Sequence, residues 1–120
     1  MDFSVEKRGD VSVVVIRESK LTYPILSAFF AGVRTLVEAG VHKLVIDLQY
    51  VNYIDSASIG CLMDIHRLLA DKGGALRLCS LQTRVATMLS MTGVQRIVDI
   101  RADEARAVES FGPQEGNADA

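Results

Sequence analysis

The chain has 120 residues, of which 49% are hydrophobic and 23% are charged, and its formal net charge is -2. These values predict one folded domain with a buried core and argue against a disordered chain. The weak negative charge and the scattered basic residues also argue against nucleic-acid binding.

The first ten residues, MDFSVEKRGD, lack the apolar segment of a secretory signal. The sequence has no apolar run that approaches the roughly 20 residues needed to cross a bilayer. Cys61 and Cys79 lie in separate predicted elements, without a CxxC motif or a nearby histidine pair. We therefore expect a cytoplasmic protein without membrane insertion, metal or cofactor, in which both thiols are buried as small hydrophobic groups.

Two β-rich segments open the chain. Residues 3–8 and 11–17 flank Gly9 and Asp10, a pair typical of turns, and this pattern predicts a β-hairpin. Pro24 then suits the first turn of a helix, for which Thr22 is the expected N-cap, and the apolar spacing predicts a helix over 24–39.

The rest of the chain repeats a helix end, a glycine and a short apolar strand, in EAGVHKLVIDL, DKGGALRLCSL and MTGVQRIVDI. We predict helices near 57–72, 82–92 and 103–110. Repeated helix-to-strand crossovers indicate an α/β domain with a mixed, mostly parallel sheet of about four to five strands. This domain spans residues 1–111, and the polar tail 112–120 is expected to be disordered. The predicted core is Ile25, Phe29, Val33, Val45, Ile46, Leu48, Leu62, Leu69, Leu76, Leu78, Val85 and Leu89.

The stretch YIDSASIGCL, residues 53–62, joins a short strand to a helix. Asp and Ser are preferred N-caps, so the simplest interpretation is that Asp55 or Ser56 caps the helix. A helix N-terminus also tolerates an added phosphate, because its free N–H groups carry partial positive charge.

The sequence gives little support for an enzyme. It has no GxSxG, GxGxxG or P-loop motif, and its two histidines, His42 and His66, do not form a visible triad with the serines. Asp47 follows a receiver-like strand, but the chain lacks the acidic pair that would hold magnesium there. We expect Asp47 to bond to loop N–H groups, and we predict no catalytic residues.

Residues 44–100 closely resemble an STAS domain, the fold of anti-sigma factor antagonists and of sulfate-transporter tails, and residues 3–40 resemble it in general arrangement. The resemblance rests on the 55–60 segment, which is similar to the motif D-S-S/T-G-L-G, and on Leu89-Ser90-Met91-Thr92-Gly93-Val94, which is similar to a later marker. It implies a stand-alone antagonist that binds an anti-sigma factor, itself a GHKL-type serine kinase, in a partner-switching pathway. The implied partner-binding residues are Asp55, Ser56, Ala57, Ser58, Ile59 and Gly60.

In the antagonist branch, the residue two positions after the motif Asp accepts phosphate, and here that position holds Ala57. Three hypotheses follow: Ser58 accepts phosphate instead, Ser56 does so, or the domain is not switched by phosphate. We expect Ser58 to be the better acceptor, because Ser56 is the better-placed cap and its hydroxyl would be committed to backbone N–H groups.

Two further functions remain possible on the sequence. Single-domain STAS proteins also resemble accessory subunits of ABC-type lipid transporters, which pack on an ATPase without a phosphorylation cycle, and Ala57 agrees with such a role. An enzyme with Ser56 or Ser58 as its nucleophile would need a base that the sequence does not show.

Overall fold

The predicted N-terminal hairpin forms one edge of the main sheet. A computed structural model of the chain, which describes residues 1–113, pairs β1 (Phe3–Arg8) antiparallel with β2 (Val11–Ile16), with Phe3 opposite Ile16. The turn uses Gly9 in the left-handed conformation, at a φ of 66°. The hairpin prediction is confirmed.

The sheet continues from the hairpin with parallel strands. The remaining strands are β3 (Lys20–Leu21), β4 (Lys43–Asp47), β5 (Tyr53–Ile54), β6 (Ala75–Cys79) and β7 (Asp99–Arg101). Within residues 1–113 the main sheet has five strands in the order β1-β2-β4-β6-β7, and every pair after β1–β2 is parallel. The mixed, mostly parallel sheet is therefore confirmed, and β3 and β5 form a separate small parallel pair.

Four helices of the described chain alternate with these strands: α1 (Tyr23–Glu38), α2 (Ser56–Asp71), α3 (Thr83–Ser90) and α4 (Glu104–Glu109). A short 3-10 helix, Val94–Arg96, follows α3. Each α-helix begins within one residue of its predicted start, because proline, cap residues and glycine stops are local signals. The prediction for residues 112–120 lies, from residue 114 on, outside the described residues.

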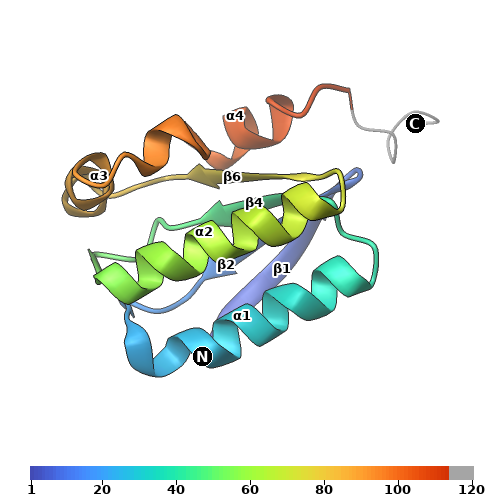
Figure 1. Cartoon of the computed structure of the whole chain (residues 1–120). Helices are drawn as coiled ribbons and strands as arrows, with labels where there is room; N and C mark the ends of the chain where they lie inside the picture. Colours follow the sequence, from blue (N-terminus) through green and yellow to red (C-terminus); the bar gives the residue numbers. More distant parts are fainter. Residues whose placement is uncertain (114–120) are drawn as a thin grey trace.

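The helices cover the two faces of the main sheet unequally. In Figure 1, α1 and α2 lie side by side on one face, and α4 lies on the opposite side of the strands. Strand β2 is buried along its whole length, and its side chains alternate between the two layers. Val14 and Ile16 join the cluster beneath α1 and α2, whereas Val13 and Val15 join the cluster beneath α4.

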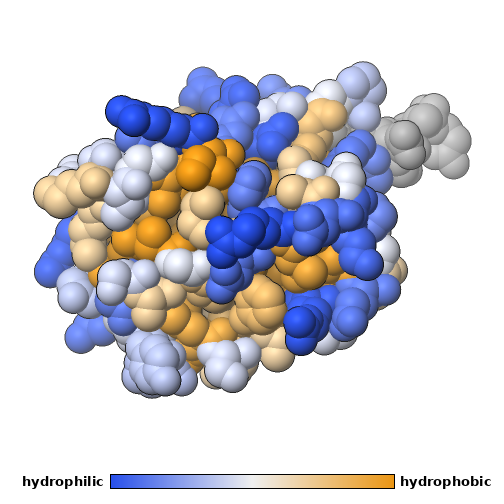
Figure 2. Space-filling view, viewed as in Figure 1, coloured by the Kyte–Doolittle hydropathy of each residue, from blue (hydrophilic) through white to orange (hydrophobic). Residues whose placement is uncertain are grey.

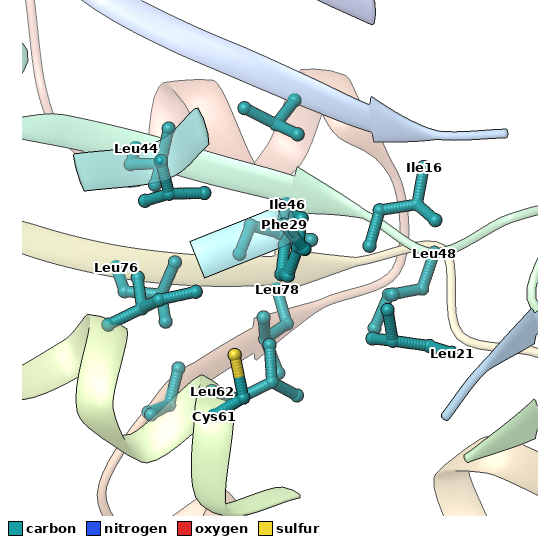
Figure 3. Packing of buried hydrophobic residues seen from close by; sticks show 14 of the residues in the cluster. Ile16, Leu21, Phe29, Leu44, Ile46, Leu48, Cys61, Leu62, Leu76 and Leu78 are labelled. Atoms are coloured by element: carbon teal, nitrogen blue, oxygen red, sulfur yellow. The ribbon is translucent and has the colours of Figure 1, made fainter. Parts of the chain in front are cut away.

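The larger core lies between the sheet and the α1–α2 pair (Figure 3), where side chains of β4, β6 and both helices meet. Every predicted core residue except Ile25 is buried. Ile25 is only partly buried and packs against the edge of this cluster, whereas its neighbour Leu26 is buried. No helix within residues 1–113 is long and apolar enough to cross a membrane.

The loops that follow β4 and β6 lie at one end of the sheet. The parallel strands β4 and β6 end on the side where α2 and α3 begin, on the left in Figure 1. The small pair β3–β5 lies at this end, with Lys20 opposite Tyr53, and leads directly into α1 and α2. Ligands and partners of open α/β sheets bind at such carboxyl ends.

Candidate functional site

The start of α2 is closed by a reciprocal set of hydrogen bonds. Asp55, in extended conformation, is the N-cap, and its Oδ1 accepts from the Ser58 N–H at 2.8 Å. In return, Ser58 Oγ accepts from the Asp55 N–H at 3.0 Å and donates to the Asp55 carbonyl at 2.7 Å. This is a capping box with serine in place of the usual Glu or Gln, and it satisfies backbone groups that a helix start leaves free.

The expectation that Ser56 is the better-placed cap is wrong. Ser56 is the first helical residue and is exposed, and its hydroxyl makes no hydrogen bond to another residue of the 1–113 region. Ser58 instead is 0% exposed, and its hydroxyl is engaged twice by Asp55. The reason is geometric: a cap side chain must reach forward to the third helical N–H, and only Asp55 stands at that distance from Ser58.

Asp55 also serves the first helix. Its second carboxylate oxygen, Oδ2, accepts from the Tyr23 N–H at 3.0 Å, although the two residues are 32 positions apart. Thr22 occupies the predicted N-cap position of α1, but its side chain makes no capping hydrogen bond within the described chain. One carboxylate thus caps the N-termini of two helices.

These contacts set the charge state of Asp55. Partial burial raises the pKa of this carboxyl, but hydrogen bonds from the Ser58 and Tyr23 N–H groups outweigh it. The net effect holds the pKa of Asp55 below its ordinary value, so the carboxylate is ionised at neutral pH and favoured beside two positive helix ends.

The remaining residues of the 55–60 segment form the accessible first turn of α2. Gly60 is exposed beside Ser56, whereas Ala57 and Ile59 are half-buried against neighbouring side chains. The structure therefore brings the sequence-predicted residues together as one surface, with Ser58 beneath it. Position 57 carries a methyl group, so this residue offers no hydroxyl for modification.

The loop beneath this surface is fixed by Asp47. This buried side chain accepts from the Gln49 N–H at 2.9 Å and from its amide Nε2 at 3.0 Å, which confirms the predicted role of Asp47. Gln82, just before α3, donates to the Gln49 carbonyl at 2.7 Å. The loops after β4 and β6 are thereby tied to each other.

Aromatic and basic side chains border the site, and sequence reasoning did not single them out. The Arg84 guanidinium lies 5.2 Å from the centre of the Tyr53 ring, and Arg17 lies 5.4 Å from that of Tyr50. The pairs come from segments far apart in the chain, and only the β3–β5 topology brings Lys20 beside Tyr53.

Neither cysteine is chemically poised for reaction. Burial raises the pKa of the Cys61 thiol to about 11 and that of Cys79 to about 12, and both are free thiols. Both are therefore protonated at neutral pH and act as small apolar groups. Among residues 1–113, no group of three or more His, Cys, Asp or Glu side chains is arranged to hold a metal ion.

Comparison with known proteins places this site in a family. The chain is 32% identical over 74 residues to an anti-sigma-B factor antagonist of Bacillus subtilis, covering 62% of this chain and 67% of that protein. It is 28% identical over 65 residues to an anti-sigma F factor antagonist of Paenibacillus polymyxa, covering 54% of this chain and 56% of the relative.

A solved structure agrees with these sequence matches. The crystal structure of a candidate anti-sigma factor antagonist from Thermotoga maritima superposes with a TM-score of 0.81 at 29% identity, covering 90% of this chain and 92% of that one. The family model for the STAS domain matches residues 2–107. This range contains all the strands and helices described above, apart from the last two residues of α4. The chain therefore belongs to the STAS domain family.

Proposed function

We propose that this chain is an anti-sigma factor antagonist, a binding protein that docks on a serine-kinase anti-sigma factor through the first turn of α2. The observation that carries the proposal is the doubly engaged Asp55, which fixes the start of α2 and with it the surface made by Ser56, Ala57 and Gly60. The names of the Bacillus and Paenibacillus relatives support the same function. That the partner is a serine kinase is part of the proposal.

The proposed point of control is Ser56. A kinase needs a hydroxyl that can reach the γ-phosphate in line, and Ser56 is the exposed serine of the 55–60 segment. Phosphorylation of Ser58 would require breaking its two hydrogen bonds to Asp55 and opening a fully buried site. Burial thus argues against the sequence-based preference for Ser58.

A phosphate on Ser56 is expected to change binding and leave the fold intact. It adds about -1.5 to -2 charges at pH 7. Because Ser56 is the first residue of α2, the helix N-terminus stabilises the added charge. A partner that buries the free hydroxyl would have to desolvate that charge, which weakens docking.

The partner and the acceptor can be tested with the purified anti-sigma factor of the source cell. We expect the wild-type chain to form a complex with it in size-exclusion chromatography. After incubation with ATP, we expect mass spectrometry to find one phosphate on Ser56, no label on Ser56→Ala, and normal labelling of Ser58→Gly if that variant remains folded by circular dichroism.

Other results would redirect the proposal. A wild-type chain that stays unlabelled while Ala57→Ser is labelled would mean that binding is not switched by phosphate in this protein. Failure to bind the anti-sigma factor, together with co-purification with an ABC ATPase, would support the transporter-subunit alternative, with which Ala57 is compatible.

A further inference from the structure

A groove of about 470 Å³ runs between the N-terminal halves of α1 and α2, beside the proposed docking surface. Tyr23, Leu26 and Phe30 line it from α1, and Ala57, Gly60 and Asp64 line it from α2. Figure 2 shows hydrophobic surface on the face that carries these two helices, including the part over their N-terminal halves. The exposed rim residues Tyr23 and Gly60 leave the groove open to solvent.

The glycine at position 60 of α2 indicates space for a group of a binding partner. Glycine inside a helix is destabilising relative to alanine, so its presence needs a reason. Gly32 in α1 has one, because a Cβ there would lie 2.7 Å from Cζ of Phe3. A Cβ on Gly60 would meet nothing within 4 Å, so the described fold itself gives no reason for the missing side chain. A partner group that approaches the α2 backbone closely supplies that reason.

The two walls of the groove are joined by the site itself. Asp55 accepts from Tyr23 N–H on the α1 side and from Ser58 N–H on the α2 side, at 3.0 and 2.8 Å. The groove is therefore preformed where the two helices start, and an incoming group has little ordering to impose. It is also continuous with the proposed surface, because Ala57 and Gly60 belong to both.

The charge of the groove indicates what fits it. Among its lining residues Asp64 is the charged one. Its ion pair with Arg67 is largely exposed, with side-chain exposures of 56% and 63%, so it contributes little and can be exchanged. The walls thus suit an apolar group with a cation beside it.

We propose that this groove receives a large apolar side chain of the anti-sigma factor, with a lysine or arginine next to it facing Asp64. This inference rests on the proposed function and names the anchor of that interaction. Buried apolar anchors in preformed pockets carry most of the affinity in protein interfaces. The missing side chain at Gly60 is then space for the partner.

The proposal can be tested with substitutions that fill the groove and leave the fold stable. In Gly60→Leu the new side chain enters open space and replaces the glycine in a helix, so the melting temperature should not fall. Calorimetric titration with the purified anti-sigma factor should show at least tenfold weaker binding. Ala70→Leu, which adds a leucine to an exposed position near the end of the same helix, should bind like the wild type.

Two more variants test the α1 wall of the groove and the carboxylate of Asp64. Ser27→Tyr fills the groove from an exposed position of α1 and should also weaken binding at least tenfold. Asp64→Lys should weaken binding and reverse its salt dependence, because it repels the proposed cation.

The outcomes separate the two proposals. Wild-type binding that persists within twofold in both Gly60→Leu and Ser27→Tyr would overturn the groove while leaving the antagonist function intact. A wild-type chain that does not bind the anti-sigma factor would overturn both.

Discussion

The two serines of the 55–60 segment differ in what surrounds their hydroxyl groups. Ser58 is 0% exposed and bonded twice to the Asp55 backbone, whereas Ser56 faces solvent at the start of α2. From sequence alone both are hydroxyls at a helix start, and the sequence-based choice of Ser56 as the better-placed cap is wrong because Asp55 is the N-cap. The distinction depends on where the helix begins: Asp55 is extended and Ser56 is the first helical residue.

This difference predicts that alanine substitution lowers stability at Ser58 and leaves it nearly unchanged at Ser56. Ser58→Ala removes the acceptor of the Asp55 N–H and leaves a buried donor unpaired, which should cost about 1–3 kcal/mol of unfolding free energy. Ser56→Ala changes an exposed residue and should stay within about 0.5 kcal/mol of the wild type. Urea unfolding of both variants measures this, and equal stabilities would contradict the capping box.

The depressed pKa of Asp55 predicts a pH dependence. A carboxyl whose folded pKa lies below its unfolded value of about 3.9 stabilises the fold fully above that value, and the stabilisation is lost as pH falls through the folded pKa. Asp55→Asn cannot titrate and keeps a single carbonyl acceptor for the two N–H groups. The difference in unfolding free energy between wild type and Asp55→Asn should be constant from about pH 5 to 7 and should shrink below about pH 4.

Thermal or urea unfolding across this range tests the sign. A stability difference that grows as the pH is lowered would contradict the assignment of Asp55 as an ionised cap of both helices.

At the scale of elements, glycines divide into those the packing needs and those it does not. A Cβ on Gly74, between α2 and β6, would lie 2.0 Å from the backbone oxygen of His42. The same oxygen accepts from the Ala75 N–H at 2.9 Å, so it cannot move away freely. Gly60 meets no such neighbour.

Alanine substitutions at these two positions should therefore change stability in opposite directions. Gly74→Ala should lower the free energy of unfolding by about 1–3 kcal/mol, the usual cost of overpacking. Gly60→Ala should raise it by about 0.5–1 kcal/mol, the helix preference of alanine over glycine. Chemical denaturation of the two variants side by side gives both values, and destabilisation by Gly60→Ala would show an internal role for that glycine.

The elements themselves were largely predictable because their signals are local. Pro24, the glycine stops and the apolar periodicity predicted the helices to within a residue or two, and the hairpin followed from Gly9 and Asp10. What the sequence did not reveal depends on residues distant in the chain. The link from Tyr23 to Asp55 spans 32 positions, and the groove between α1 and α2 exists only after the helices pack.

At the scale of the whole molecule, the proposed docking surface lies at the end of the sheet where α1, α2 and α3 begin. Asp47 fixes the loop after β4, Gln82 ties that loop to α3, and Asp55 joins α1 to α2. The core and these hydrogen bonds hold the helix starts in place, so the proposed phosphate or partner at Ser56 would meet a surface whose backbone is already positioned. Regulation by such a surface requires a change of charge and not of fold.

Under the proposed function, this chain frees a sigma factor by occupying its anti-sigma factor. The most direct measurement follows the fluorescence anisotropy of a labelled sigma factor bound to the anti-sigma factor while the chain is added. Wild type should lower the anisotropy to the value of free sigma factor, and Ser56→Asp, with an unchanged melting temperature, should need at least tenfold higher concentration. Anisotropy that stays constant at saturating wild-type chain would contradict the antagonist function.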